Sequence, residues 1–401
     1  MSIEPRVQEE QTQALQRQAQ ALLPDAIALR RRIHEHPELG LDNPRTRDAI
    51  LESLAGLDLE LQHSERTSGV VALLRGGRPG PTILLRADTD ALPMPEDTGL
   101  PFASKQENRM HACGHDAHVA MLASGARLLA GRRDELAGNV KFVFQPGEEG
   151  LGGAKVLIEE GLLTQPEVDA AFAIHIDPTV PAGAVASRPG ALLAAADAFV
   201  VDVRGKGGHA SMPHHTVDPI PVACEIVAAL QSLVTRRVNV FDPAVLSVTQ
   251  VKAGTAFNVV PEVAQIMGTI RTVSPRTRDF MRRGLERVVA GVCAAHETTG
   301  DVRLFPGYPV TLNDGGFVDF ARRVSSDVVG EERWIEMPAP IMGAEDFSYV
   351  LEQVPGAMVF LGVRPDEGPV APIHSNRMVL NESALATGIA LHAAMALAYL
   401  S

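Results

Sequence analysis

The residues that point most directly to chemistry lie in the segment 110–118, which reads MHACGHDAH. Within it, Cys113, His115, Asp116 and His118 bring a thiol, two imidazoles and a carboxylate close together. Each of these groups is costly to bury without a partner. Thiolate and imidazole donors suit zinc-like ions, so the segment is typical of a divalent metal site. A solvated polar loop in front of a helix is the alternative that this segment alone leaves open.

Further candidate ligands follow predicted strands, where open α/β sheets bind their ligands. They are Asp88 and Asp90, Glu148 and Glu149, and His175, after strands predicted at 82–88, 139–145 and 170–175. Adjacent Glu148 and Glu149 repel each other unless they share a cation, and one can bind metal while the other serves as a base. His374, in the loop APIHSN, is another candidate. Charged turns and ordinary core or surface histidines are the structural alternatives.

A second group of polar residues lies in the middle of the chain. The glycine-rich loop GKGGHAS surrounds His209, and glycines allow a ligand to approach the backbone closely. Asn258 in TAFNVVP and Arg271 in GTIR could bind a carboxylate, because a guanidinium offers a planar fork. A solvated charge at a strand end is the alternative for Arg271. His214 and His215 are expected in a polar loop.

Other kinds of active site are less consistent with the sequence. The chain has no G-x-S-x-G elbow, no H-E-x-x-H helix and no phosphate-binding GxxxxGK[ST] loop. Cys113 could act as a nucleophile with His115, but metal ligation explains more of the surrounding histidines and carboxylates. Cys224 and Cys293 lie in apolar helical segments, which predicts that both are small core residues.

The elements that must position these residues alternate between helices and strands. Helices are predicted at 5–36, with a restart at Pro24, and at 115–129. Together with the strands at 69–75, 82–88, 139–145 and 170–175, they predict a mostly parallel mixed sheet covered by helices on both faces.

Between about residues 188 and 307 the predicted order becomes β-α-β-β-α-β, the split pattern of a ferredoxin-like α+β fold. We therefore predict a catalytic domain in two parts, 1–187 and 308–401, with an inserted domain at 188–307. The candidate hinges are 188–190 and 305–309.

Composition limits the environment and the partners of the chain. Its formal charge of −13 excludes a general nucleic-acid surface. The polar N-terminus lacks the pattern of a secretory signal, and no apolar run reaches the ~18 residues of a membrane span. An odd count of three cysteines suggests free thiols. We expect a cytoplasmic protein with neither a membrane nor a nucleic acid as partner.

Taken together, these residues resemble the metal-dependent aminoacylase and carboxypeptidase amidohydrolases. The branch is that of hippurate hydrolase, N-acyl-L-amino acid amidohydrolases and indole-acetyl-amino-acid hydrolases. The matching segments, in order, are RRRIHEHPELG, LLRADTDALP, MHACGHDAHVAML, VFQPGEEGLGGA, GKGGHASMPHHTVDPI, AFNVVP, GTIRT and GAEDFS. They span nearly the whole chain. Gly147 departs from the pattern, because many relatives have alanine there.

The resemblance implies a zinc-peptidase-like catalytic domain with two divalent metal ions, and a lid domain that also forms a homodimer. The implied metals are zinc or manganese, with nickel and cobalt as alternatives. The implied metal ligands are Cys113, His115, Glu149, His175 and His374. The implied catalytic residues are Glu148 and His209, and the implied substrate-binding residues are Asn258 and Arg271. Asp90 is implied to orient one of the metal ligands.

These implications lead to one functional hypothesis, which is hydrolysis of the amide bond of N-acyl amino acids, hippurate-like or otherwise acylated. A metal-activated water attacks, with Glu148 as general base and then acid. His209 helps to hold the oxyanion, and the lid closes over the small-molecule substrate. A dipeptidase, deacetylase or desuccinylase of the same family is the alternative enzyme. A metal-binding protein without catalysis is the alternative from another class, and the intact Glu148 argues against it.

Overall fold

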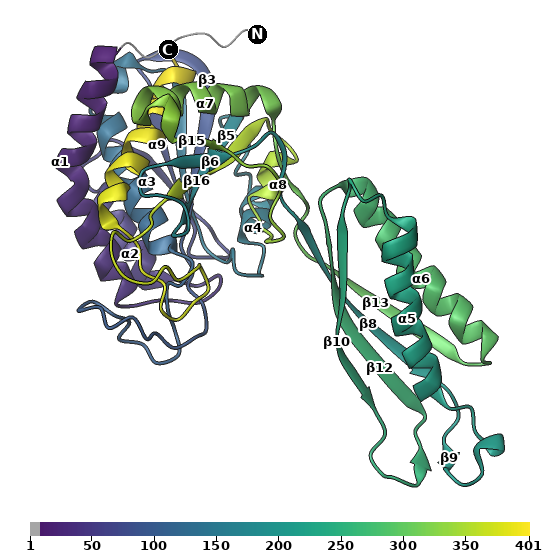
Figure 1. The fold of residues 1–401 in the computed structure, drawn as a ribbon. Helices are drawn as coiled ribbons and strands as arrows, with labels where there is room; N and C mark the ends of the chain where they lie inside the picture. Colours follow the sequence, from purple (N-terminus) through teal and green to yellow (C-terminus); the bar gives the residue numbers. More distant parts are fainter. Residues whose placement is uncertain (1–8) are drawn as a thin grey trace. The chain divides into compact units, whose positions relative to one another are not determined.

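The computed structural model describes residues 9–401, which form two compact units (Figure 1). Unit 1 contains the described residues up to Leu192, together with Leu312–Ala339 and Asp346–Ser401. Unit 2 contains Leu193–Thr311 and Pro340–Glu345. In the described part of the chain, every helix is too short or too polar to cross a membrane.

Unit 1 is built on an eight-stranded sheet with the order β1-β2-β4-β3-β5-β16-β6-β15. The neighbours from β4 to β16 run parallel, as do β6 and β15, whereas β1 to β4 and the pair β16 and β6 are antiparallel. The strands are β1 (Glu60–His63), β2 (Val70–Arg75), β3 (Arg78–Asp88), β4 (Ala137–Gln145), β5 (Ala170–Asp177), β6 (Val185–Ser187), β15 (Trp334–Glu336) and β16 (Gly356–Gly362). The predicted mostly parallel mixed sheet is confirmed.

Helices cover both faces of this sheet. Alternate strand residues, such as Ile83 and Leu85 of β3, join one large core with five helices, whereas α4 contacts β4 and α8. The helices of unit 1 are α1 (Glu9–His34), α2 (Pro44–Leu54), α3 (His115–Ala130), α4 (Gly153–Glu159), α7 (Gly315–Val329), α8 (Ser348–Leu351) and α9 (Leu385–Tyr399).

The first helix differs from the sequence expectation. Instead of restarting at Pro24, α1 continues through it, although an interior proline removes one backbone hydrogen bond. Leu15, Ala19 and Ala26 are buried where α1 packs on α3 and α9, so side-chain packing holds the helix across the missing bond. Residues 5–8 of the predicted helix lie outside the described residues.

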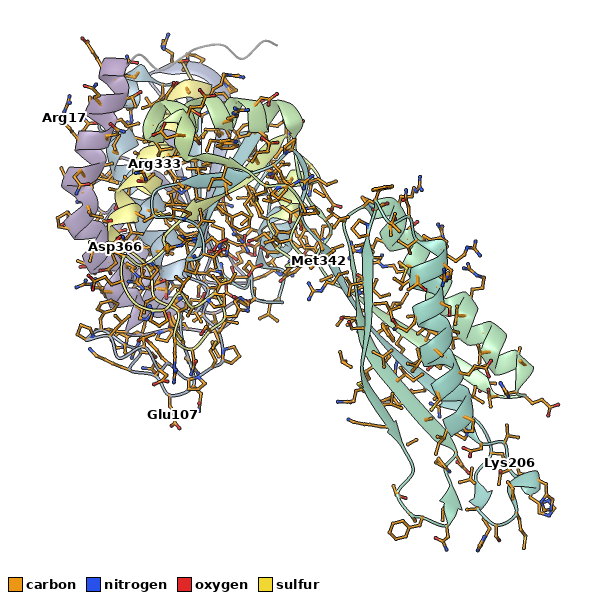
Figure 2. All side chains as sticks on the ribbon, viewed as in Figure 1. Arg17, Glu107, Lys206, Arg333, Met342 and Asp366 are labelled. Carbon is orange, nitrogen blue, oxygen red and sulfur yellow. The ribbon has the colours of Figure 1, made fainter. Side chains whose placement is uncertain are left out.

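Unit 2 has the predicted β-α-β-β-α-β order, which confirms a ferredoxin-like arrangement. Its four antiparallel strands lie in the order β10-β12-β8-β13, and its two helices share one core with the sheet. The elements are β8 (Ala195–Arg204), α5 (Pro219–Arg237), β10 (Ala244–Ala253), β12 (Val263–Thr272), α6 (Pro275–Ala295) and β13 (Thr299–Pro306). The short strand β9 (Gly208–His209) follows the loop that contains Lys206, which is labelled in Figure 2. It pairs with the short strand β11 (Val259–Val260). A further pair consists of β7 (Gly190–Leu193) and β14 (Thr311–Asn313).

The two cysteines of unit 2 do not share one environment. Cys293 of α6 is buried as predicted, but the prediction that Cys224 is a core residue is wrong, because its side chain is exposed. The buried face of α5 is formed by other residues, including Val222, Ile226 and Leu230. Cys224 lies outside this buried face. The apolar residues next to it in the sequence led to the wrong prediction that it is buried.

Candidate metal centre

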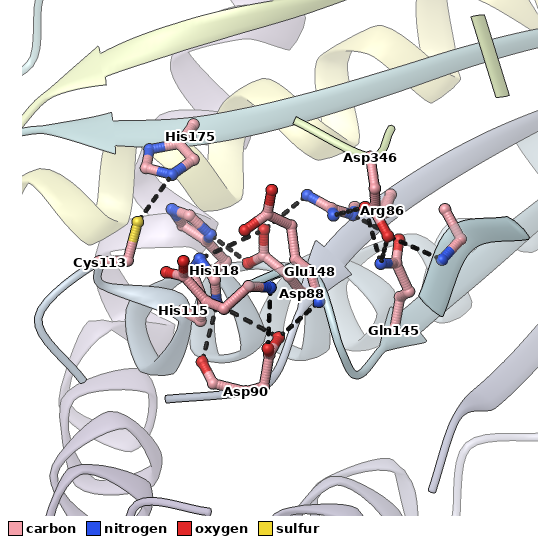
Figure 3. Close-up of polar contacts among 12 residues, drawn as sticks. Arg86, Asp88, Asp90, Cys113, His115, His118, Gln145, Glu148, His175 and Asp346 are labelled. Atoms are coloured by element: carbon pink, nitrogen blue, oxygen red, sulfur yellow. Dashed lines mark hydrogen bonds and ion pairs between the residues drawn. The ribbon is translucent and has the colours of Figure 1, made fainter. Parts of the chain in front are cut away.

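One end of the sheet in unit 1 carries a compact cluster of potential metal ligands (Figure 3). Its members come from five segments: the residue before the Gly114 cap of α3, the first residue of α3, the loop after β4, the strand β5 and the loop after β16. Three overlapping groups each place their ligand atoms within 4.8 Å of one another. They are Cys113 with His115 and His175, Cys113 with Glu149 and His374, and His115 with Glu148 and Glu149. The structure thus brings together all five implied ligands and Glu148.

The turn into α3 allows neighbouring residues of the chain to share this cluster. Gly114, between Cys113 and His115, has a left-handed backbone with φ of 83°, which other residues adopt only with strain. A side chain there would also lie 2.5 Å from a carbon of Ile176. Glycine therefore permits both the backbone turn and the close approach of β5.

Two of the imidazoles present a lone pair to the cluster. His115 Nδ1 lies 2.8 Å from the backbone oxygen of Asp90, and His175 Nδ1 lies 2.7 Å from the backbone oxygen of Ile176. A carbonyl can only accept, so each Nδ1 carries a hydrogen, and the lone pair of the neutral ring lies on Nε2. His115 Nε2 is buried without a hydrogen-bond partner among the described residues, and His175 Nε2 lies 3.4 Å from Cys113 Sγ. This arrangement fits metal ligation.

Asp90 fixes the two glutamates. Its carboxylate accepts the backbone N–H of Glu148 at 2.9 Å and that of Glu149 at 3.0 Å. Through its own backbone oxygen it also holds His115. The Glu148 side chain is only 6% exposed, so the loop presents a shielded carboxylate beside the potential ligands.

The electrostatics of the cluster favour bound positive charge. Hydrogen bonds to Cys113 and Glu149 raise the pKa of His374 to about 10. Burial alone would lower the pKa of His115, but the charges of Asp88 and Cys113 raise it well above its ordinary value. Burial raises the pKa of the Cys113 thiol. By contrast, burial and the nearby His118 lower the pKa of His175 well below its ordinary value, so its neutral ring is available as a ligand. At His115 and His374, a divalent cation would take the place of the protons.

The four candidates of segment 110–118 separate in the structure. Cys113 and His115 join the cluster, whereas Asp116 accepts from Arg30 at 2.9 Å and from His34 at 2.8 Å in a buried ion-pair network. His118 also turns to other protein groups. Sequence reasoning missed Arg30 and His34 as supporting residues, although they lie in the matching segment RRRIHEHPELG.

Among the candidate residues of unit 2, two lie together and one lies apart. His209 and Asn258 are neighbours, because β9 pairs with β11 and the Ala210 N–H donates to the Asn258 backbone oxygen. Arg271 lies near the far end of the ten-residue strand β12, opposite Ala196 and Val245. A strand rises about 3.3 Å per residue, so within unit 2 Arg271 is distant from the other two residues.

Comparison with known proteins gives this geometry a context. Peptidase family M20/M25/M40 matches residues 84–398. The chain is 39% identical over 378 residues to thermostable carboxypeptidase 1 of Saccharolobus solfataricus, covering 93% of this chain and 95% of the relative. It is 40% identical over 378 residues to IAA-amino acid hydrolase ILR1-like 2 of Arabidopsis thaliana, covering 93% of this chain and 85% of the relative.

A solved structure agrees with this chain in fold. The dinuclear metal binding peptidase of the M20 family from Bacillus subtilis superposes with a TM-score of 0.82 at 35% identity, covering 95% of this chain and 99% of that protein. The matched family, these relatives and the clustered ligands agree with one another. The chain belongs to peptidase family M20/M25/M40 and is a metal-dependent hydrolase that acts on amide bonds.

Proposed function

We propose that this enzyme hydrolyses the amide bond of N-acyl amino acids, with two divalent cations held by the clustered thiol, imidazoles and carboxylate. The observation that carries the proposal is the meeting of five potential ligands with the shielded Glu148 at one end of the sheet. The ligands would be Cys113, His115, Glu149, His175 and His374.

Bound divalent cations would supply Lewis acidity, which polarises the amide carbonyl and makes a water easier to deprotonate. Glu148 then accepts the proton of the attacking water and returns it to the amide nitrogen as the C–N bond breaks. The Asp90 carboxylate accepts a hydrogen bond from the backbone N–H of Glu148. The Glu148 carboxylate is therefore attached to a fixed loop, as a base that must act on a positioned water requires.

His209 is suited to donate a hydrogen bond to the substrate oxygen. The backbone N–H of Ser211 donates to His209 Nδ1 at 3.2 Å, and the Ser211 hydroxyl lies 2.9 Å from the same atom. Nδ1 must therefore accept, which leaves the hydrogen on Nε2. We propose that this N–H stabilises the developing oxyanion and that Arg271 binds the substrate carboxylate. Asn258, which lies beside His209 and apart from Arg271 within unit 2, would then contact another polar group of the substrate.

The adjacent glutamates provide a matched test of this proposal. Glu148→Gln should keep two metal equivalents but lose about 10²–10⁴-fold in kcat, because the amide cannot take a proton from water. Glu149→Gln should lose metal. Metal analysis and steady-state kinetics on purified protein measure both effects. Glu148→Gln with undiminished turnover would remove the proposed base.

A substrate panel tests the acyl group and the bond. Zn²⁺- or Mn²⁺-loaded enzyme should cleave hippurate-like, indole-acetyl or other N-acyl amino acids with higher kcat/KM than dipeptides. Dipeptides, acetylated and succinylated amino acids in the same panel represent the alternative enzymes. A preference for dipeptides would replace the proposed substrate class with a peptidase function.

A further inference from the structure

A buried hydrogen-bond network lies next to the cluster, and His118 of α3 is part of it (Figure 3). Its Nδ1 is 2.5 Å from Asp88 Oδ1, and its Nε2 accepts the backbone N–H of Ile176 at 2.9 Å. Because a backbone N–H only donates, Nε2 must accept and Nδ1 carries the hydrogen that goes to Asp88. Both ring nitrogens are engaged, and the side chain is 1% exposed.

These bonds separate His118 from the metal ligands it resembles. Asp88, His115 and His118 also place ligand atoms within 4.8 Å of one another, so residue types and distance alone would allow a cation there. A cation on His118 Nε2 would displace the Ile176 N–H and leave a buried donor without a partner. A cation on Nδ1 would displace the hydrogen bond to Asp88.

The contact with Ile176 connects His118 to the neighbouring ligand. Ile176 follows His175 in β5, and its backbone oxygen accepts from His175 Nδ1. The backbone N–H of Ile176 thus bonds to His118, and the backbone C=O of Ile176 bonds to His175. The rings of His118 and His175 also meet edge to face, with centroids 4.6 Å apart.

The other side of His118 is attached to the ends of two further strands. Asp88 at the end of β3 binds Arg86 Nη1 at 2.5 Å. Arg86 in turn donates to Gln145 at the end of β4 at 3.0 Å and to Asp346 at 2.9 Å. Movement of His118 is therefore restricted by strands on both sides of the cluster.

We propose that His118 is a positioning residue, which sets the backbone at Ile176 and thereby the direction of the His175 imidazole. Supporting partners of this kind typically change metal affinity by 10- to 100-fold when removed. The inference rests on the proposed two-metal site and assigns its support to a residue that binds no metal itself.

Titration with Co²⁺, followed by visible absorption and by metal content, tests this role without using activity. His118→Ala should bind one of two Co²⁺ equivalents about 10- to 100-fold more weakly and change the spectrum. His118→Gln, whose carbonyl can accept the Ile176 N–H, should recover most of the affinity. His118→Asn, which retains a donor toward Asp88, should not. His392→Gln, at a buried histidine outside this network, is the matched control and should bind like the unaltered enzyme.

The outcomes of the Co²⁺ titration distinguish the positioning role of His118 from the proposed two-metal site on which it rests. Failure of the unaltered enzyme to bind two equivalents would overturn the proposed site and this inference with it. Two equivalents in the unaltered enzyme, with equal affinities and spectra in all His118 variants, would overturn only the positioning role. Should His118→Ala not fold, the comparison of the Gln and Asn variants decides, and equal affinities of those two would overturn the role.

Discussion

At the scale of single residues, the sequence revealed the chemical groups but not how each is held. Strand ends and residue types were sufficient to name Cys113, His115 and the glutamate pair as candidates. The tautomers of His115 and His175 depend on backbone oxygens of Asp90 and Ile176, and a backbone oxygen leaves no mark in a sequence. For the same reason, the distinct surroundings of His118 could not be predicted.

The thiolate should set the choice of metal. Cys113→Asp replaces a soft sulfur with a hard oxygen, so we expect two ions to remain bound while preference shifts from Zn²⁺ toward Mn²⁺ by several-fold or more. Competition dialysis followed by metal analysis measures the ratio. Cys224→Asp, at an exposed position in unit 2, is the control. An unchanged Zn²⁺ to Mn²⁺ ratio in Cys113→Asp would show that softness does not decide the preference.

Because of His392, we expect the folded protein to lose stability in acid. Burial in α9 lowers its pKa from 6.5 to about 3, so between these values the unfolded chain binds a proton that the folded chain does not. Stability contributed by the neutral ring is therefore complete above pH 6.5 and falls with decreasing pH, by up to about 1.4 kcal/mol per unit.

His392→Leu should remove this part of the pH dependence. Denaturant unfolding at pH 7.5 and 5.5 measures the loss of free energy for both proteins, and the loss should be smaller in the variant by roughly 1 kcal/mol. An equal loss in both proteins would mean that His392 becomes protonated without unfolding.

At the scale of elements, the pattern of the sequence was sufficient to predict the β-α-β-β-α-β order of elements along unit 2 and the helix-covered sheet of unit 1. It failed where packing overrides local preference. Pro24 predicted a break that the contacts of α1 with α3 and α9 prevent. Apolar neighbours predicted burial of Cys224, whereas the orientation of α5 exposes it.

Two glycines in helices give opposite predictions. A methyl group on Gly388 of α9 would lie 2.0 Å from the Met121 sulfur, whereas one on Gly291 of α6 would meet nothing within 4 Å. Gly388→Ala should therefore destabilise unit 1 by about 1–3 kcal/mol through overpacking. Gly291→Ala should stabilise unit 2 by about 0.5–1 kcal/mol, because alanine favours a helix interior.

Denaturant unfolding of both glycine variants measures these changes against the unaltered chain. A Gly388→Ala protein as stable as the unaltered one would show that Met121 has room to rearrange between α3 and α9.

At the scale of the whole molecule, the chain leaves the sheet fold of unit 1 for unit 2 and returns to it. The sequence indicated an insertion at 188–307 from its β-α-β-β-α-β order, and the second unit spans Leu193–Thr311 with the additional segment Pro340–Glu345. The segment Pro340–Glu345 is far from the rest of unit 2 in the sequence and too short to show a periodic pattern. The alternation of hydrophobic residues therefore could not assign it to unit 2. The roles of unit 2 as lid and dimerisation domain stay predictions.

The edge strand β10 is where we expect a second copy of the chain to pair. This ten-residue strand lies at the edge of its sheet and exposes Val245 and Val251, and such edges favour pairing with another chain. Val251→Lys should convert a dimer into monomers in light scattering with size exclusion. Val240→Lys, exposed but outside the strand, should keep the dimer mass. A monomeric unaltered protein would contradict the expectation.

The three attachments of Asp90 constrain how this enzyme can evolve. One residue anchors the backbone of Glu148, the proposed catalytic base, the backbone of Glu149, a proposed ligand, and the imidazole of His115 on another element. Selection therefore cannot adjust proton transfer and cation affinity independently at this position. New substrate preferences should arise through changes in the pocket loops, while position 90 stays constant across descendants that remain active.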